Sequence, residues 1–514
     1  MPQARWLYSL YTLITMLFVA IPASGQASSN TIVVAISGDL SPDGNGALSI
    51  PEVPVIHNGG SAVFTSDLRT DEFLVGSGIF SGNGTPGSLV LIVREDAPTP
   101  NIDGNFGPFN NPPLRVNGSN QVAFISSVTN ALDPLSAMGC FIADGTLGGV
   151  TEIARANQLT PSGDGRLAFP FSDPAFNDVG QVAFASFLTE TSATSGRYGI
   201  FRAVDSPGGL TEIVRLGQIA PDGVGNFTSI GPPQGVPLNE SGHVLFNGRV
   251  SGQDSIYTGL FRGDGNSVAE VVREGSVTPS GNGTFGRFDL TAPAFNNAGE
   301  AAFVASLNDT ALAAADNVGL FRGDGVTMTE IVRKGDTVPG GDGRFLEIAP
   351  NVALNDAGQV LFAAALSGAS GGTDAGIFIG DGGELISIAR FGGAAPGGEG
   401  TFSDFIPVTL ALNAAGQAVF MALIDLPSGI GATDATGLFF YDRANGLLPV
   451  ARTGDTLADK GEISALLLNG GTWFMGDEGS GLNDQGQVAY RFTAAGNIGI
   501  AIWSAVSATP PPAQ

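Results

Sequence analysis

The sequence predicts an all-β fold, an eight-bladed β-propeller in which each blade is a four-stranded antiparallel sheet. Three observations support this prediction. A unit of about sixty residues recurs along the 514-residue chain, and each unit holds four short apolar segments separated by Gly, Asn and Asp. One further unit is divided between the two ends of the chain. Periodicity on this scale is typical of propellers and other repeat architectures.

Each unit is marked by an Asn-x-x-Gly turn followed by a strand that carries an aromatic residue. The pairs are Asn117 and Phe124, Asn177 and Phe184, Asn239 and Phe246, Asn296 and Phe303, Asn355 and Phe362, Asn413 and Phe420, and Asn483 and Tyr490, with His57 and Phe64 as an earlier variant. Because the turn and the aromatic keep the same spacing throughout, we expect one structural unit to be repeated.

The unit between residues 347 and 390 shows the four strands. Short apolar runs cover 348–354, 359–366, 376–379 and 385–390. The segments between them are rich in Gly, Asn and Asp, which favour turns. Short strands punctuated in this way indicate antiparallel sheets, and no helical pattern recurs.

The two termini predict that the repeats close into a ring. Residues 32–39 match the fourth-strand segment 331–336, so the chain begins with a fourth strand that lacks its first three. Residues 483–503 supply a first, second and third strand without a fourth. Pairing the two fragments removes two open sheet edges, so we expect the N-terminal strand to complete the last blade.

The first residues have the pattern of a signal peptide. Residues 1–25 contain Arg5, then an apolar stretch, then small residues at the end. We expect residues 26–505 to form a single propeller domain and the Pro-rich residues 506–514 to form a disordered tail. No later segment has the length and apolarity of a membrane-spanning helix. The mature chain is therefore expected to be exported, periplasmic or extracellular, without a transmembrane segment.

The composition is strongly acidic, with 48 Asp and Glu against 22 Lys and Arg and a formal net charge of −26. Such a charge repels nucleic acid and anionic lipid, so we expect no nucleic-acid partner. Cys140 is the only cysteine, which excludes an intramolecular disulfide. We expect it to pack as a small apolar side chain. We also expect a monomer.

The signature Asn-x-x-Gly-x-x-Ala-Phe occurs at 177–184 and 296–303, and at 117–124 with Asn120 in place of the glycine. This pattern resembles the exported bacterial tandem-repeat proteins named for the NxxGxxAF signature. The resemblance covers nearly the whole mature chain and implies export and display at the cell surface, but no particular reaction. This chain departs from the anchored members because its C-terminal end shows no anchor pattern.

The loops predict which face of the ring binds a partner. The turns between strands one and two and between strands three and four are short, and we call their side the turn face. The opposite side, the loop face, carries the long and variable connections 188–196, 307–317 and 424–436. Long variable loops on a rigid scaffold are where binding usually resides, so we expect a site on the loop face.

Three residues of one insertion are candidate ligand-binding residues. Trp473 lies close in sequence to Asp477 and Glu478, and an exposed aromatic beside carboxylates is a composition that binds carbohydrate. The alternative is that Trp473 fills the core of the last blade.

Two carboxylates are weak candidates for a calcium site. Asp336 and Asp342 lie in the Gly-rich loop 335–343, and calcium prefers about six to eight oxygen ligands. The equivalent loop 275–283 lacks both carboxylates, which favours a turn-forming role instead. No other metal or cofactor is expected.

Two sets of repeated polar residues have alternative interpretations. Arginine ends the fourth strand at Arg94, Arg155, Arg215, Arg273, Arg333, Arg390 and Arg452. These arginines either form an annular anion site or, as we favour, pair with nearby carboxylates such as Asp336 or Asp455. The turn asparagines are expected to shape their own turns, by a left-handed backbone or a local hydrogen bond, rather than to bind a ligand.

The only histidines, His57 and His243, occupy repeat positions held elsewhere by Asn and Gln. They are too few for a histidine metal cluster and are expected to be scaffold substitutions. No catalytic residues can be assigned, because the acidic residues are too numerous for one pair to be selected.

The sequence therefore favours a non-catalytic exported propeller that binds an envelope protein or an extracellular glycan through its loop face. The alternatives are a polysaccharide lyase or glycoside hydrolase on the same scaffold, and a structural matrix component. The propeller fold alone cannot distinguish these three functions.

Overall fold

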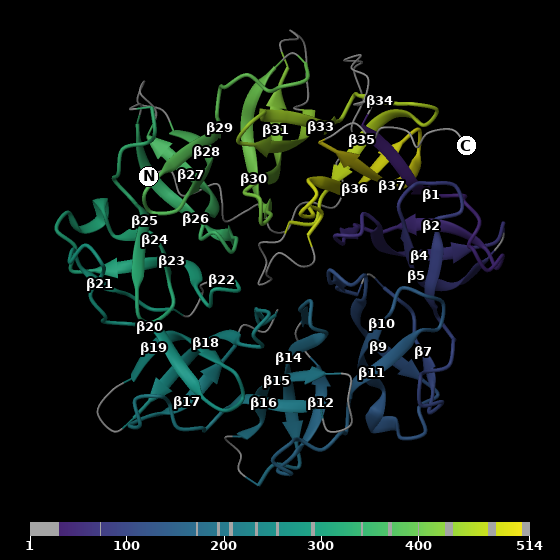
Figure 1. Cartoon of the computed structure of the whole chain (residues 1–514), viewed down its shortest axis with the longest axis horizontal. Coiled ribbons are helices and arrows are strands. Elements are labelled where there is room, and N and C mark those ends of the chain that lie inside the picture. The colour runs from purple at the N-terminus through teal and green to yellow at the C-terminus, as the bar shows by residue number, and fades with distance from the viewer. Residues whose placement is uncertain are drawn as a thin grey trace.

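The computed structural model describes residues 30–505 apart from 72, 111, 171–172, 193–195, 205–208, 232–234, 253–255, 289–292, 341–342, 368–372, 399, 427–434 and 471–479. Eight small antiparallel sheets surround a central axis (Figure 1), which confirms the predicted eight-bladed β-propeller. The residues assigned to the signal peptide and to the Pro-rich tail lie outside the described part, so both assignments stay predictions.

The first four blades follow one another along the chain. Blade 1 contains β2 (Ala47–Pro51), β3 (Val55–Ile56), β4 (Ala62–Arg69), β5 (Leu74–Gly82) and β6 (Val90–Arg94). Blade 2 contains β7 (Asn105–Phe106), β8 (Arg115–Val116), β9 (Val122–Thr129), β10 (Met138–Ala143) and β11 (Val150–Arg155), with the short 3-10 helix η2 (Pro134–Ser136). Blade 3 contains β12 (Arg166–Pro170), β13 (Ala175–Phe176), β14 (Gln181–Thr189), β15 (Tyr198–Val204) and β16 (Leu210–Arg215). Blade 4 contains β17 (Asn226–Ile230), β18 (Val244–Ser251), β19 (Ile256–Gly263) and β20 (Val268–Arg273).

The other four blades repeat the plan. Blade 5 contains β21 (Thr284–Phe285), β22 (Ala294–Phe295), β23 (Ala301–Asn308), β24 (Val318–Gly323) and β25 (Met328–Arg333), with the 3-10 helix η4 (Ala313–Ala315). Blade 6 contains β26 (Arg344–Leu354), β27 (Val360–Ser367), β28 (Thr373–Gly380) and β29 (Leu385–Arg390). Blade 7 contains β30 (Thr401–Leu412), β31 (Ala418–Asp425), β32 (Ala435–Asp442) and β33 (Gly446–Arg452). Blade 8 contains β34 (Thr456–Leu457), β35 (Gly461–Leu467), β36 (Gln487–Ala494), β37 (Asn497–Ser504) and β1 (Thr31–Ile36).

The ring closes as the termini predicted. Strand β1 pairs antiparallel with β37, in a register that runs from Thr31 opposite Trp503 to Ile36 opposite Gly499. The N-terminal strand therefore supplies the fourth strand of the last blade, and its pairing removes the open edge that β37 would otherwise present.

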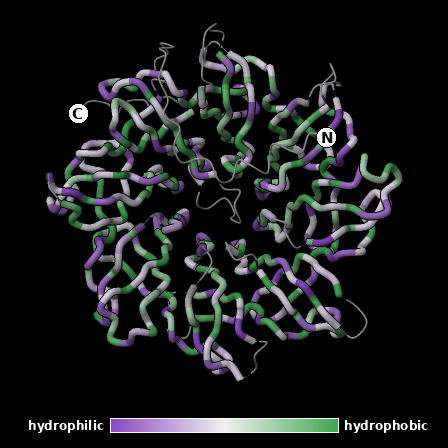
Figure 2. Tube along the Cα trace, turned by 180° about the vertical axis from the view of Figure 1, so that it is seen from behind, coloured by the Kyte–Doolittle hydropathy of each residue, from purple (hydrophilic) through white to green (hydrophobic). Residues whose placement is uncertain are grey.

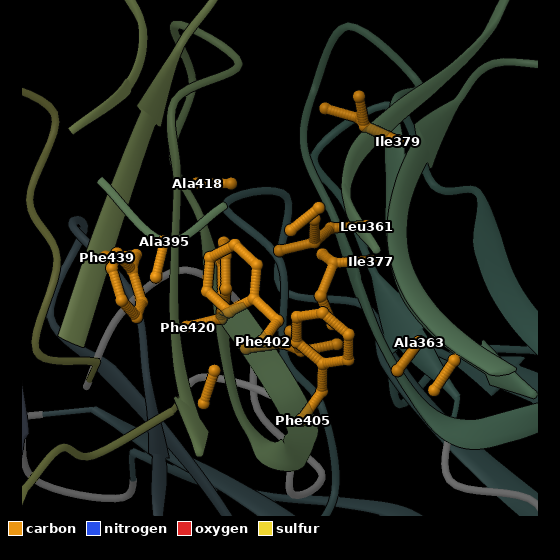
Figure 3. Close-up of a cluster of buried hydrophobic side chains, with 14 of the residues drawn as sticks. Leu361, Ala363, Ile377, Ile379, Ala395, Phe402, Phe405, Ala418, Phe420 and Phe439 are labelled. Carbon is orange, nitrogen blue, oxygen red and sulfur yellow. The ribbon is translucent and has the colours of Figure 1, made fainter. Parts of the chain in front are cut away.

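The recurring aromatic residues form the core between blades. In blade 7, Phe420 of the second strand stacks on Phe439 of the third, with centroids 5.7 Å apart. Phe402 of the first strand meets Phe439 edge-on at 5.0 Å. These rings pack against Leu361 and Ile377 of blade 6, as Figure 3 shows. Aromatic residues of the first three strands thus provide much of the buried area that joins each blade to its neighbour.

The hydropathy of the trace matches this packing. Hydrophobic segments run through every blade, and hydrophilic segments are prominent at the inner tips that border the central opening (Figure 2). Cys140 of β10 is fully buried, as expected for a small apolar residue, and burial raises the pKa of its thiol to about 12.

Candidate functional site

The central opening has a cavity at the turn face. Its volume is about 200 Å³, and it is lined by the inner ends of the first strands and by the Asn-x-x-Gly turns. Apolar side chains of the lining include Ile56, Val116, Phe176, Phe295 and Leu482. The polar lining comes from the turns, and it decides what the cavity can bind.

The turn asparagines form a ring of hydrogen bonds that joins neighbouring blades. In blade 3, the Asn177 Oδ1 accepts from the backbone N–H of Gln181 at 2.8 Å, and its Nδ2 donates to the Gln181 side chain at 3.0 Å. The same Nδ2 donates to the backbone carbonyl of Asn239 in blade 4 at 3.0 Å. Each asparagine therefore closes its own turn and also fixes the turn of the next blade.

We call this set the asparagine ring. Its members are Asn117, Asn177, Asn239, Asn296, Asn355, Asn413 and Asn483, and each reaches the next turn with an Nδ2–carbonyl distance of 3.0–3.3 Å. The expected local hydrogen bond is confirmed. The expected left-handed backbone instead belongs to the fourth residue of the turn, for example Gly180 with φ of 80° and Asn120 with φ of 64°.

The residues that follow these asparagines make a second ring, which we call the acceptor ring. Its members are Asn58, Asp178, Glu240, Asn297, Asp356 and Asp484, with Gly118 and Ala414 at the two positions that lack a polar side chain. Each of these six polar side chains uses an oxygen to accept a hydrogen bond from a backbone N–H of the preceding blade. The donor is the residue at the same turn position in that blade.

The acceptor ring is not uniform in the use of its carboxylates. Asp356 accepts from the Asn297 backbone with Oδ1 and from the Asn297 side chain with Oδ2. Asp484 likewise uses both oxygens. Asp178 and Glu240 each use one oxygen for the preceding blade's amide, and among the described residues their second oxygens accept no hydrogen bond. Two adjacent carboxylates thus retain free acceptor capacity at the cavity mouth.

His57 takes the asparagine position in blade 1. It is buried, its Nδ1 accepts from the Gly59 backbone N–H at 2.9 Å, and it accepts the Nδ2 hydrogen bond of Asn483 on its carbonyl. Burial lowers the pKa of the imidazole, with an opposing contribution from Asn120. His57 thus makes the same kinds of contact as the turn asparagines, which agrees with the expected scaffold substitution. His243, far around the ring, donates its backbone N–H to Asn239.

Arg115 of β8 is a buried cation in the cavity lining. Its side chain is 2% exposed and its Nη1 donates to the Leu114 carbonyl at 2.5 Å. The Nη2 atom lies 3.7 Å from Asp173 Oδ2, beyond hydrogen-bonding distance, and the Nε has no partner. Burial lowers the pKa of the guanidinium to about 10, and the neighbouring Asp173 opposes that shift.

Sequence reasoning did not select Arg115 or the acceptor ring, although the signals are present. The position two residues before the turn asparagine holds Ala175, Ala294, Ala353 and Ala411 in other units, so an arginine there breaks the repeat. A departure from a repeat pattern marks a residue that does not serve the repeat itself.

The predicted ligand residues Trp473, Asp477 and Glu478 lie outside the described residues, as does Asp342, so their roles stay predictions. Asp336 is described, and its Oδ2 accepts from the backbone N–H of Arg333 at 2.7 Å. Among the residues that the structure describes, no three His, Cys, Asp or Glu are grouped to hold a metal ion.

Several strand-end arginines pair with carboxylates, as the favoured interpretation predicted. The two carboxylates named as examples, Asp336 and Asp455, accept the backbone N–H groups of Arg333 and Arg452. Arg94 contacts Asp43 at 3.0 Å and Arg390 contacts Asp374 at 3.0 Å. Arg155 contacts Asp103 and Glu152, at 3.2 and 2.8 Å. Several of these carboxylates lie in the hairpin before the blade's first strand, so the arginine ties that hairpin to the fourth strand.

The loop face exposes large apolar side chains in its connections. They are Leu40, Phe73, Ile102, Leu132, Leu135, Leu159, Ile219, Val224, Val277, Leu312 and Phe391. The short turns of the opposite face expose Leu147, Val179 and Val326. Among the described residues, exposed large apolar side chains are thus more frequent in the loop-face connections than in the turns of the opposite face.

One cluster at the loop face brings a tyrosine, an arginine and a carboxylate together. The Tyr257 hydroxyl donates to Asp222 Oδ2 at 2.9 Å, and the Arg273 guanidinium lies 5.1 Å from the centroid of the tyrosine ring. Burial and the Asp222 carboxylate raise the pKa of Tyr257 to about 12. A tyrosine that holds its proton so firmly is a poor general base, so this cluster is best described as structural.

The fold and the turn-face rings define a closed β-propeller with a polar central mouth. The chain belongs to DUF7453, a family of unknown function, whose model matches residues 19–133 and 129–514. No match to a curated protein was found. No helix in the described residues is long and apolar enough to cross a membrane.

Among solved structures, the chain is similar to the β-propeller domain of the trilobed protease from Pyrococcus furiosus. The identity is 10% and the TM-score 0.38, over 78% of this chain and 98% of that one. It is similar to polysaccharide lyase Uly1 at 9% identity and TM-score 0.37, over 83% and 99% of the two chains. A PL25 ulvan lyase matches at 10% identity and TM-score 0.30, over 82% and 98%. These similarities are too distant to assign an activity.

Proposed function

We propose that the chain is a non-catalytic binding scaffold, exported from the cell, that holds a partner on its loop face. The observation that carries this proposal is the concentration of exposed apolar side chains in the loop-face connections. The carboxylates of the turn face act in contrast as acceptors between blades, and so does the backbone carbonyl of His57.

The chemistry of the loop face favours a protein partner over a glycan. The exposed side chains described there are mostly aliphatic, such as Ile102, Leu132 and Ile219. Sugars are usually recognised by aromatic platforms, whereas apolar patches rimmed by polar residues mark protein interfaces. An envelope protein is therefore the proposed partner, and an extracellular glycan is the alternative that Trp473 would favour.

The test compares two triple variants in an envelope extract of the producing cell. The loop-face variant carries Ile102→Asp, Leu132→Asp and Ile219→Asp. The turn-face variant carries the same type of substitution, Leu147→Asp, Val179→Asp and Val326→Asp. We expect one defined protein to be retained by the unmodified chain and the turn-face variant and to be lost with the loop-face variant. Equal retention by both variants contradicts the proposal.

A second assay addresses catalysis directly. The unmodified chain is incubated with a panel of neutral and acidic polysaccharides, and new reducing ends and unsaturated uronates are measured. We expect neither product. Turnover of any member of the panel would replace the scaffold proposal with the lyase or hydrolase alternative.

A further inference from the structure

The starting observation is the unused donor capacity of Arg115. The side chain lines the turn-face cavity and is 2% exposed, yet it makes one hydrogen bond, to the Leu114 carbonyl. Within the described part of the chain its Nε has no hydrogen-bond partner, and the carboxylate oxygen of Asp173 is 3.7 Å from Nη2. A buried guanidinium costs free energy unless its donors are satisfied, so this site calls for an acceptor.

The free donor of the guanidinium specifies the acceptor. Nε is buried, so a ligand in the cavity reaches the guanidinium through Nη2, whose N–H groups suit a carboxylate oxygen. Nη1 is already occupied by the Leu114 carbonyl, on the other side of the guanidinium. A carboxylate in the cavity can therefore bind without displacing a protein hydrogen bond.

The charge of the lining excludes a simple anion. Asp178, Glu240, Asp356 and Asp484 surround the mouth, and Arg115 is the only formal cation among the described residues of the lining. Among the described lining residues, this excess of negative charge repels a ligand that carries only a carboxylate. A ligand that also carries an ammonium group converts the repulsion into attraction.

The free acceptors belong to the two blades that follow Arg115 around the ring. Asp178 accepts the N–H of Gly118, three residues after Arg115, and Glu240 accepts the N–H of Asp178. The second oxygens of these two carboxylates accept no hydrogen bond among the described residues. Arg115, Asp178 and Glu240, from blades 2, 3 and 4, all line the same cavity.

We propose that the turn-face mouth of the channel binds a small zwitterion. The Nη2 group of Arg115 donates to its carboxylate, and Asp178 and Glu240 accept its ammonium group. The cavity of about 200 Å³ is of the size of an amino acid or a very short peptide. This site is on the opposite face from the proposed partner surface and does not depend on it.

The first experiment uses three probes on the unmodified chain, measured by isothermal titration at low ionic strength. L-lysine carries both kinds of charge, cadaverine is lysine without its carboxylate, and hexanoate is the same carbon chain without either ammonium group. We expect lysine to bind more tightly than either control, by about tenfold or more. Each control lacks at least one of the charged contacts that lysine makes, and one such contact contributes about this factor. Binding of cadaverine as tight as lysine, or no binding of lysine, overturns the proposal.

The second experiment locates the site. Arg115→Gln is expected to reduce lysine affinity about tenfold or more and not to weaken cadaverine binding, because it removes a positive charge from the lining. Asp178→Asn keeps an oxygen for the Gly118 amide and is expected to weaken both lysine and cadaverine. Asp356→Asn removes the same charge from the same ring, where both oxygens are occupied, and is the matched control.

Equal losses in Asp178→Asn and Asp356→Asn would show a diffuse acidic attraction and contradict the assigned site. Lysine binding that survives Arg115→Gln would contradict it as well. Circular dichroism and thermal unfolding verify that each variant is folded. If Arg115→Gln does not fold, the comparison of lysine with cadaverine on the unmodified chain still decides the proposal.

Discussion

The side chain of Asn483 donates a hydrogen bond to the backbone carbonyl of His57 at 3.1 Å, although 426 residues separate the two in the chain. This contact joins blade 8 to blade 1 at the turn face. The β1–β37 ladder forms a separate joint between the two ends of the chain. The ring is thus closed both at its inner turns and along a strand edge.

The asparagine ring is expected to contribute directly to stability. Asn239→Ala removes the acceptor of the His243 N–H and the donor to the Asn296 carbonyl, both in a buried setting. We expect the free energy of unfolding to fall by about 1–3 kcal/mol, measured by denaturant titration. Asn266→Ala, at an exposed turn, is the control and should change it by less than about 0.5 kcal/mol. Equal losses in both variants contradict an inter-blade role.

The strand that closes the ring gives a second prediction. Ala35 of β1 is fully packed against Ile500 and Ile502 of the last blade, whereas Ile32 of the same strand is 41% exposed. Ala35→Asp places a charge in this interface and should cost about 3 kcal/mol or more, because no partner is available to it. Ile32→Asp should be nearly neutral. Thermal unfolding of the two variants measures the difference, and similar midpoints would show that β1 does not close the blade in solution.

The fold could be predicted from the sequence because its evidence is local and repeated. The four strands of a unit and the Asn-x-x-Gly turn are each specified within a few residues, and the split unit specified the pairing of β1 with β37. The inter-blade bond from Asn177 to the Asn239 carbonyl could not be predicted, because it joins residues 62 apart whose distance depends on the geometry of the closed ring.

The site was predictable only in part for the same reason. Sequence spacing identified the loop face as variable, but it did not show which side chains are buried. The unsatisfied guanidinium of Arg115 is a property of the assembled cavity. The break in the repeat at Arg115, where Ala175 and Ala294 stand in other units, was the available signal. Its meaning depends on burial, which requires the neighbouring blades to be in place.

His57 predicts a pH dependence of stability. Burial lowers the imidazole pKa below its ordinary value, so the unfolded chain binds a proton at a higher pH than the folded chain does. Stability from this group is therefore present above a pH of about 6.5 and is lost as the pH falls through the lower folded pKa. His57→Asn, which restores the residue of the other units, should flatten this part of the stability profile. Unfolding midpoints of both chains between pH 5 and pH 7 measure it, and parallel profiles would contradict the assignment.

The two interruptions of the acceptor ring predict opposite results for the same substitution. Ala414→Asn supplies an oxygen for the backbone N–H of Asp356, and it should raise the free energy of unfolding by about 0.5–1 kcal/mol. At Gly118, a Cβ would lie 2.9 Å from Asp178 Oδ1, the oxygen that accepts the Gly118 N–H. Gly118→Asn must therefore displace the carboxylate and break that hydrogen bond, which destabilises the protein. Denaturant titration of both variants tests the geometry of the ring. If only the introduced asparagine mattered, and not its position, the free energy of unfolding would change in the same direction in both variants.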